Sequence, residues 1–521
     1  MRDLKWNRKI LSFALLLIVS SASAQLSSVQ IDSVVEKTLK TFDVPGIAVA
    51  VVKDGKIIHA KGYGVRSLNT MQKMNEHTLF GVASNSKAVT VACLGILIDE
   101  KKIRLDDKVT DYIPEFKLYN PYVTEEFTIR DLLTHRSGLG LGSGDLMFWP
   151  DSNNFTKADM IHNLRYLKQV SSFRTKYDYD NNMYIVAGEV IAKVTGQSWE
   201  TFVQNRILTP LGMNESAPSF TLLKNASNVI DPHAPVDGKV QVVRRDWSKN
   251  ADAAGGIYSN VTDWSKWIIM QMNNGKYGEG LSNQLFSNAI HEEMWTPQTI
   301  IPVRGPGPYR THFAGYGLGW FLSDVMGYKQ VTHTGGLAGI VTQVTMLPEL
   351  KLGIIVFTNQ QSGAAFNAVT NSIKDGYFGI KADRINEYHD QVVKFENSAR
   401  NTTSNIWKEI ETQVKNNSSK VDLNNYTGTY NDQWFGNIEI TNVNGQLYFN
   451  SKRSFLLNGE MMHYKGNTFI VKFKDRSLDA DSYVRFTVDD NGKASGFKMA
   501  PISPTTDFSF DFQDLDLKKV N

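Results

Sequence analysis

Residues 80–98 read FGVASNSKAVTVACLGILI, and this stretch decides the centre of the fold. The apolar run from 88 to 98 predicts a buried helix, and Ser84 and Lys87 stand at its start. Residues three apart lie on one helix face, so the lysine amine can reach the serine hydroxyl and serve as its base. The unpaired N–H groups of a helix start also favour a developing alkoxide. The stretch therefore predicts a nucleophilic serine.

Two other readings of this pattern stay open at this point. Ser84 can be a helix-capping residue and Lys87 a solvated lysine of the first turn. Ser495 and Lys498 repeat the same spacing in a region that is typical of β-strands, where no helix aims the pair. The pattern alone is weak, and its context has to decide.

Later segments supply that context. Tyr179-Asp180-Asn181 comes just before the helical run 184–194, and His333-Thr334-Gly335-Gly336 joins two predicted strands of a hairpin. In order and context the segments resemble the serine β-lactamase and penicillin-binding-protein superfamily, most closely its class C β-lactamase-like branch of esterases, D-amino-acid peptidases and β-lactamases. The resemblance extends to residues 127–139 (FTIRDLLTHRSGL) and 208–213 (LTPLGM), and it covers roughly residues 31–379.

The resemblance implies roles for named residues. Ser84 would form an acyl-enzyme, with Lys87 and Tyr179 as candidate bases. We expect nearby Lys87 and His333 to lower the pKa of Tyr179, so that the phenol can serve at neutral pH. The backbone N–H groups of Ser84 and Gly336 would form the oxyanion hole. The predicted residues for binding substrate and the oxyanion are Asn181, His333, Thr334, Gly335 and Gly336.

His333 departs from the superfamily pattern. β-Lactamases and penicillin-binding proteins usually carry lysine here, where a permanent cation recognises the substrate carboxylate. A histidine is only partly charged near neutral pH, which weakens that recognition. The substitution therefore favours an esterase or a peptidase over a β-lactamase, while a structural histidine at the strand start stays open.

Composition and the N-terminus bear on compartment and partners. The 521 residues carry a net charge of +3 with both signs interspersed. This pattern does not predict the concentrated positive surface that binds nucleic acid. Residues 1–24 combine basic residues, an apolar run and small residues ending in Ala24, which is typical of a secretory signal peptide. We therefore expect a secreted or periplasmic protein with no membrane attachment after cleavage. The single cysteine, Cys93, reads as a buried core residue.

Strand signals at both ends of a long helical middle predict an α/β (α+β) β-lactamase-like sandwich, an antiparallel sheet flanked by helices. We expect this serine hydrolase domain over residues 25–381 and a linker or helix over 382–420. Short strands separated by Asn-Gly and Gly-Asn turns predict a small antiparallel β domain over 421–521, which resembles the lipocalin-like domain appended to many superfamily members. It could gate or cap the cleft, or drive oligomerisation. Its aromatic pair Trp434 and Phe435 would suit an interface if exposed, although burial in the domain's own core is favoured.

These patterns predict a secreted serine hydrolase that cleaves an ester or an amide, including D-amino-acid-containing peptides, through an acyl-enzyme on Ser84. The alternatives are a class C-type β-lactamase or D-Ala-D-Ala carboxypeptidase, and a non-catalytic binding protein of the same fold. Loops 138–156 and 302–313 would line the cleft without a decisive residue. Histidines with metal-ligand spacing are absent from the sequence, so we predict no metal and no cofactor. The expected partner is a small-molecule or peptide substrate, and a homo-oligomer is allowed.

Overall fold

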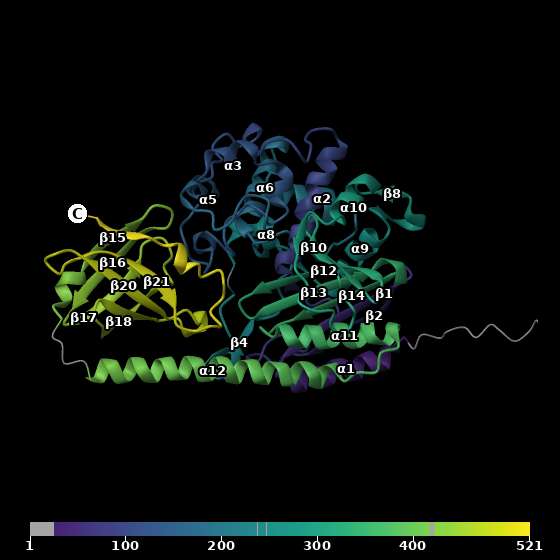
Figure 1. The fold of residues 1–521 in the computed structure, drawn as a ribbon. Coiled ribbons are helices and arrows are strands. Elements are labelled where there is room, and N and C mark those ends of the chain that lie inside the picture. Colours follow the sequence, from purple (N-terminus) through teal and green to yellow (C-terminus); the bar gives the residue numbers. More distant parts are fainter. Residues whose placement is uncertain (1–24, 237, 246, 417–420, 521) are drawn as a thin grey trace, which may run out of the picture.

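The computed structural model describes residues 25–236, 238–245, 247–416 and 421–520. The predicted signal peptide, residues 1–24, lies outside the described residues. Figure 1 shows two bodies, a sheet covered by helices and a smaller β-barrel, with one long helix running beneath both. We call them the sheet domain and the barrel. This architecture confirms the predicted fold class.

The sheet domain is built on eight antiparallel strands in the order β2-β1-β14-β13-β12-β11-β10-β9. The N-terminal hairpin therefore pairs with the last strand of the domain, as strand signals at both ends of the segment predict. The predicted strand at 317–323 is wrong at its start, because residues 317–320 form the connection between two strands. The bounds are β1 Gly46–Lys53, β2 Lys56–Gly64, β9 Thr299–Ile301, β10 Ala314–Tyr316, β11 Phe321–Val325, β12 Tyr328–Leu337, β13 Ile340–Leu347 and β14 Leu352–Thr358.

Helices cover both faces of this sheet, and β1 shows why. Its residues Ile47, Val49 and Val51 belong to the core with α1 (Ser28–Thr41) and α11 (Gly363–Phe378). Ala48 and Ala50 point to the opposite face and join the main core, which contains α9 (Val261–Met272). Because successive strand residues alternate between faces, a strand that is apolar throughout must be covered on both sides.

The helical middle of the chain forms the layer that carries the site. Its central element is α2 (Ser86–Asp99), which is buried from Ser86 to Leu97. Such a helix needs neighbours all round, and it contacts α6 (Asn181–Thr195) and α8 (Asp252–Gly255). The other helices of the domain are α3 Pro121–Glu126, α4 Ile129–Leu132, α5 Lys157–Asn163, α7 Trp199–Val203 and α10 Asn288–Met294.

The segment predicted as a linker or helix contains α12 (Arg384–Asn416), a helix of 33 residues. It packs on α11 and α1, and its far end packs on the barrel through Ile406, Trp407, Ile410 and Val414. Their spacing of about one turn forms a narrow apolar stripe. The barrel closes by pairing β15 with β22. Its strands are β15 Gly428–Asp432, β16 Gly436–Val443, β17 Gln446–Ser451, β18 Asn458–Lys465, β19 Thr468–Phe473, β20 Ser482–Val488, β21 Ala494–Pro501 and β22 Leu517–Val520.

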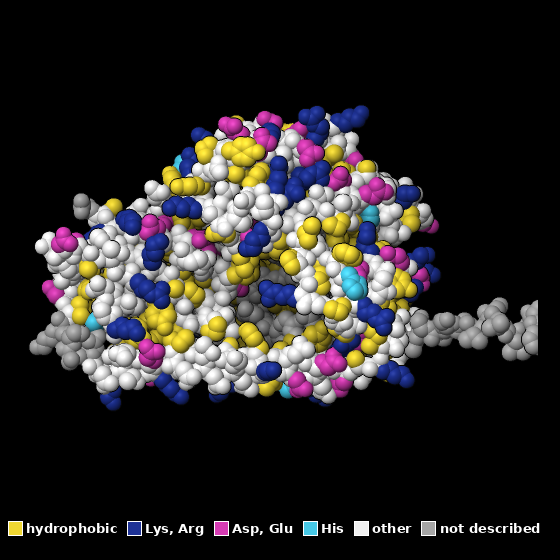
Figure 2. Space-filling view, in the orientation of Figure 1, with side chains coloured by type: hydrophobic (Ala, Val, Ile, Leu, Met, Phe, Trp, Pro, Cys, Tyr) yellow, Lys and Arg dark blue, Asp and Glu magenta, His cyan; other side chains and the backbone are white. Residues whose placement is uncertain are grey.

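The barrel also packs directly on the sheet domain. Arg453 pairs with Asp159 at 2.9 Å and lies 4.0 Å from the ring centre of Phe155. The rings of Phe155 and Phe435 are 6.0 Å apart, so the predicted aromatic pair Trp434–Phe435 is buried, with Phe435 where the two domains meet. Figure 2 shows a hollow in this face between the two domains, and charges of both signs scattered around it. Nowhere in the described ranges is a helix long and apolar enough to cross a membrane.

Candidate active site

Ser84 stands in a tight turn between a short strand and the central helix. The turn η1 (Ala83–Asn85) follows β3 (Phe80–Gly81), and Ala83 adopts a left-handed φ of 51°, a conformation that non-glycine residues take only under constraint. The Asn85 amide donates to Oγ1 of Thr342 at 2.9 Å and ties the turn to β13. Asn85, not Ser84, is the cap residue of α2. The reading of Ser84 as a helix cap is therefore wrong.

Lys87 lies next to Ser84, as the spacing predicts. Its Nζ lies 3.1 Å from Oγ of Ser84, 2.7 Å from Oδ1 of Asn181 and 2.9 Å from the carbonyl oxygen of Ala254. The side chain is completely buried, so the reading as a solvated lysine is also wrong. Burial lowers the pKa of Lys87 to about 7, against the opposing attraction of Asp145 and Asp180.

The contacts of Lys87 fix the direction of its lone pair. A neutral amine has two N–H bonds and one lone pair. The amide oxygen of Asn181 and the carbonyl of Ala254 can only accept hydrogen bonds, so they take both N–H bonds. The lone pair is left for the hydroxyl of Ser84, which then donates. This arrangement suits a general base that removes the serine proton.

Asp145 determines how the Asn181 amide is turned. Nδ2 of Asn181 donates to Oδ2 of Asp145 at 2.9 Å, which leaves Oδ1 of Asn181 facing Lys87. Oγ of Ser509, from the barrel, donates to the same carboxylate oxygen at 2.9 Å. Burial raises the pKa of Asp145 well above its ordinary value, and the hydrogen bonds from Asn181 and Ser509 act the other way. Neither Asp145 nor Ser509 was predicted from the sequence.

Tyr179 lies beside the pair, but its predicted protonation state is wrong. Its ring centre is 4.7 Å from Nζ of Lys87, and the residue lines the same cavity as Ser84. We expected Lys87 and His333 to lower its pKa. Instead burial raises the pKa of Tyr179 well above its ordinary value, because the phenolate would lose its hydration inside this aromatic cluster. Tyr179 is therefore a neutral phenol at neutral pH.

His333 is neutral as well, which corrects the expectation of partial charge. Its Nδ1 donates to the carbonyl of Thr334 at 2.6 Å, so Nε2 accepts from the hydroxyl of Tyr316 at 3.0 Å. Burial lowers the pKa of His333 to about 3, and the nearby Lys87 acts in the same direction. The ring therefore offers neither a charge nor an unused N–H to a substrate carboxylate.

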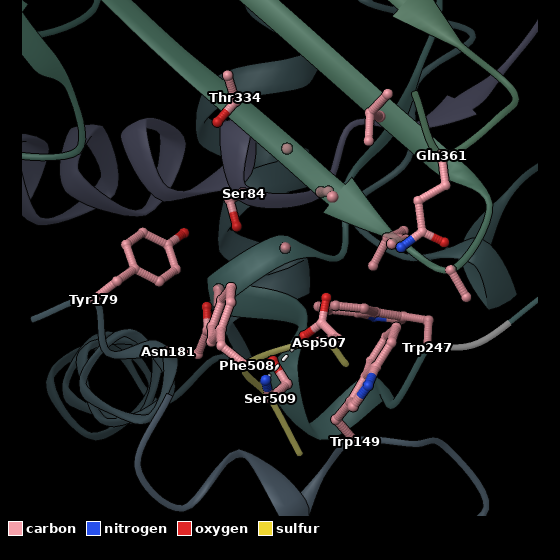
Figure 3. Close-up of a pocket in the computed structure, with 18 of the residues that line it drawn as sticks. Ser84, Trp149, Tyr179, Asn181, Trp247, Thr334, Gln361, Asp507, Phe508 and Ser509 are labelled. Atoms are coloured by element: carbon pink, nitrogen blue, oxygen red, sulfur yellow. Dashed lines mark hydrogen bonds between the residues drawn. The ribbon is translucent and has the colours of Figure 1, made fainter. Parts of the chain in front are cut away.

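The strand β12 brings the predicted glycine pair to the site. Its antiparallel partner β11 begins at Phe321, opposite Thr332, so residues His333 to Leu337 of β12 extend beyond β11. This free edge runs along the cavity into which the Ser84 hydroxyl points (Figure 3). Seven of the eight predicted site residues therefore line one cavity. The eighth, Lys87, lies behind the cavity wall and contacts the lining residue Ser84.

The cavity has a volume of about 520 Å³ and is rich in aromatic side chains. Figure 3 shows Trp149 and Trp247 across the cavity from Tyr179, with Asp507, Phe508 and Ser509 of the barrel entering from below. The predicted loop 302–313 contributes no residue to this cavity as far as the chain is described, which corrects that expectation. Its Tyr309 instead donates to Asp375 of α11 at 2.7 Å.

Asp180 and His135, two polar residues near the site, support the pocket wall and are not exposed in the cavity. The side chain of Asp180 caps α6 by accepting from the Met183 backbone, and it also accepts from Ser137 at 3.2 Å. His135 packs its ring 4.3 Å from that of Tyr179 and accepts from the Asp180 backbone. Both therefore shape the pocket wall from behind. In the part of the chain that the structure describes, no group of His, Cys, Asp and Glu could hold a metal ion.

Comparison with known proteins agrees with this geometry. The family model described as "Beta-lactamase" matches residues 31–375, and one described as "Domain of unknown function (DUF3471)" matches residues 412–519. The chain is 29% identical over 432 residues to "Unguisins hydrolase ungD" of Aspergillus violaceofuscus, which covers 78% of this chain and 75% of that protein. It is 26% identical to "Protein flp" of Staphylococcus aureus, over 70% of each chain.

Among solved structures, the octameric penicillin-binding protein homologue from Pyrococcus abyssi superposes with a TM-score of 0.61 at 21% identity. The match covers 95% of this chain and 100% of that one. At this identity the likeness concerns the fold, and it includes the barrel as well as the sheet domain.

Proposed function

The chain belongs to the beta-lactamase family of serine hydrolases, and from that membership we propose that it cleaves an ester or an amide through an acyl-enzyme on Ser84. The observation that carries the proposal is the contact of 3.1 Å between Ser84 Oγ and a fully buried Lys87 amine. A binding protein has no use for a serine aligned with a dehydrated amine, which costs folding free energy. The reading as a non-catalytic binder is therefore disfavoured.

Lys87 is the base in this proposal. With a pKa of about 7, half of the Lys87 side chains are neutral near pH 7, so the lone pair is available. Ser84 Oγ attacks the substrate carbonyl carbon while Lys87 takes the hydroxyl proton. The negative oxygen that forms is held by the backbone N–H groups of Ser84 and Gly336, and each such donor contributes about 10²–10³ in rate.

Tyr179 acts as an acid. The tetrahedral intermediate collapses when the bond to the leaving oxygen or nitrogen breaks, and that atom needs a proton. The neutral phenol of Tyr179 lies next to Ser84 and can supply it, and the Lys87 ammonium then restores the phenol proton. Water then attacks the acyl carbon while the neutral Lys87 amine takes a proton from it. That proton passes to Ser84 Oγ as the ester bond breaks, which frees Ser84 and returns Lys87 to its neutral form.

The cavity favours a substrate with a bulky apolar group and without a carboxylate at the His333 position. Trp149, Trp247 and Phe508 line a volume of about 520 Å³, which suits an aromatic or branched acyl group. His333 is neutral and its two ring nitrogens are engaged, so it cannot pair with a carboxylate. This favours an ester or a peptide amide over a β-lactam or a D-Ala-D-Ala terminus. The fungal relative is named as a hydrolase of unguisins, which is in keeping with hydrolysis.

We further propose that the protein is exported, because residues 1–24 have the composition of a signal peptide. The mature N-terminus of the protein secreted by a host with a Sec pathway tests this point. Cleavage after Ala24 is the expected result, and an intact Met1 in the cytoplasmic fraction contradicts it.

Intact-mass spectrometry tests the hydrolase proposal. The protein is incubated with a fluorophosphonate and, separately, with a penicillin, beside a Ser84→Ala control. We expect one phosphonyl adduct that maps to Ser84 and is missing from the control, and no stable penicilloyl adduct. Absence of the phosphonyl adduct contradicts the acyl-enzyme mechanism. A persistent penicilloyl adduct on Ser84 moves the assignment to penicillin-recognising enzymes.

Hydrolysis of p-nitrophenyl esters then tests the substrate class. A phenylacetyl ester is expected to show a higher kcat/KM than an acetyl ester, because its ring can fill the aromatic cavity. Equal values for the two esters contradict the proposed acyl group.

A further inference from the structure

The barrel matches a domain of unknown function, yet it touches the catalytic machinery. Its segment between β21 and β22 leaves the barrel and enters the cavity, where Asp507, Phe508, Ser509 and Phe510 are lining residues. Figure 3 shows this segment directly below the site. We call residues 507–514 the barrel strap.

The barrel strap binds one loop of the sheet domain, residues 143–146, through several hydrogen bonds. Asp511 is fully buried and accepts the backbone N–H groups of Gly144 and Leu146, at 2.6 and 3.1 Å. Asp514 accepts from the hydroxyl of Ser143 at 2.8 Å. A buried carboxylate is stable only when such donors satisfy it, so these contacts define one position for the loop.

Asp145 lies in the middle of that loop, and the strap binds its side chain too. Ser509 Oγ donates to Oδ2 of Asp145, the same atom that receives the Asn181 amide. Both residues are buried, with Asp145 at 0% and Ser509 at 7% exposure. Four side chains, three of them buried and Asn181 partly buried, therefore form one hydrogen-bonded chain from the barrel to the base, in the order Ser509, Asp145, Asn181 and Lys87.

The direction of each bond matters for the chemistry. Oδ2 of Asp145 accepts from both Ser509 and Asn181, so the Asn181 NH₂ must face Asp145 and its oxygen must face Lys87. If the amide turned over, its NH₂ would face the Lys87 amine and compete for the lone pair. Ser509 holds the carboxyl group that prevents this inversion.

We propose that the C-terminal barrel completes the catalytic centre of this enzyme, with Ser509 as a positioning residue that acts on Lys87 through Asp145 and Asn181. The proposal rests on the function assigned to Ser84 and Lys87 above. It gives the domain of unknown function a role in catalysis rather than in attachment alone. Ser509 does not touch the reacting atoms, and its effect is expected in kcat more than in KM.

The test uses the full chain, three single variants in the barrel, and Asp145→Ala with and without Ser509→Ala. Ser509→Ala removes the hydroxyl, and Ser509→Thr restores it. Ser482→Ala is the matched control, because Ser482 is a fully buried barrel serine whose hydroxyl donates to the backbone of Ala480. The readouts are the rate of Ser84 phosphonylation by a fluorophosphonate, and kcat and KM for a p-nitrophenyl ester.

We expect Ser509→Ala to lower the phosphonylation rate and kcat about tenfold, the effect of one buried hydrogen bond, with a smaller change in KM. Ser509→Thr should recover most of the rate, and Ser482→Ala should react like the parent protein. In an Asp145→Ala background, Ser509→Ala should cause no further loss, because its partner is already missing. Wild-type rates in Ser509→Ala overturn the inference, as does a full additional loss in the Asp145→Ala background.

This experiment separates the two proposals. If the parent protein is not phosphonylated at Ser84, the proposed function fails. If the parent reacts and Ser509→Ala reacts equally fast, only the role of the barrel fails. If Asp145→Ala does not fold, the comparison of Ser509→Ala, Ser509→Thr and Ser482→Ala still decides, since none of these three alters a residue of the sheet domain.

Discussion

Gly335 of β12 packs directly on Ala83, the residue before the nucleophile. A Cβ added to Gly335 would lie 2.8 Å from Cβ of Ala83, 2.5 Å from Oγ1 of Thr342 and 2.3 Å from the carbonyl oxygen of Val82. The strand can approach the Ser84 turn only because this side chain is missing. At Gly336, an added Cβ meets nothing within 4 Å and would stand in the cavity.

These two glycines give a matched pair of variants. Gly335→Ala is expected to push β12 away from Ser84 and displace the Gly336 N–H, which lowers the acylation rate by about 10²–10³. Gly336→Ala keeps the same N–H and should change the rate for a small acetyl ester far less. The phosphonylation rate and the melting temperature of both variants check this. Equal losses in the two variants contradict the close packing described for Gly335.

The activity of the wild-type enzyme should rise with pH through about 7. The base form of Lys87 is the neutral amine, and its pKa is lowered to about 7, so kcat/KM falls as the pH drops below this value. A pH profile of ester hydrolysis from pH 5 to 9 measures the midpoint. Activity that is still rising steeply at pH 9 contradicts a dehydrated Lys87 as the base and favours an ordinary amine or a phenolate.

The lowered pKa of Lys87 should also make the free energy of unfolding depend on pH. Its pKa is about 7 in the folded protein, below the ordinary 10.5, so between these values the unfolded chain binds a proton that the folded chain does not. The free energy of unfolding therefore rises with pH across this window, by about 5 kcal/mol at the usual 1.4 kcal/mol per pH unit. Lys87→Met lacks this gain. Its stability relative to wild type should decline as the pH rises from 7 to 10.

Urea unfolding of both proteins at several pH values checks this expectation. A constant difference between Lys87→Met and wild type over this range contradicts the lowered pKa. Lys87→Arg is a useful companion, because it keeps a permanent charge and should be inactive at every pH.

Tyr179→Phe should lower kcat to different extents for substrates with different leaving groups. The neutral phenol protonates the departing atom, so the variant should lose about 10²–10³ in kcat for an amide or an alkyl ester. A p-nitrophenyl ester, whose leaving group departs without a proton, should lose much less. The midpoint of the pH profile should stay near that of the wild type, since Lys87 sets it. Equal losses for both kinds of substrate contradict the role of Tyr179 as an acid.

Local sequence patterns predicted much of the fold. The Ser84–Lys87 spacing placed the two side chains 3.1 Å apart, because a helical turn brings residues three apart together whatever surrounds it. Alternating and continuous apolar runs located the hairpin β12–β13 and the apolar stripe at 406–414. Tyr179 and Asn181 were placed by the resemblance to a known superfamily, and the structure brings both to Ser84.

Apart from the start of the strand predicted at 317–323, the predictions that failed depended on what surrounds a residue in the folded protein. Charge proximity suggested a lowered pKa for Tyr179 and partial charge on His333. Dehydration inside a packed aromatic cluster outweighs both effects, and the extent of burial is a property of the assembled core. Loop 302–313 carries no signal that it packs toward Asp375 rather than toward the cleft.

The sequence by itself placed Ser84 beside Lys87 and located hairpins in both domains, because each of these follows from residues that are close along the chain. Only the tertiary structure decided that Lys87 is dehydrated, that Asp145 orients Asn181, and that Ser509 reaches Asp145 from 364 residues away. Contacts over such separations depend on how finished domains dock, and that docking depends on shape and burial over a whole interface rather than on any local pattern.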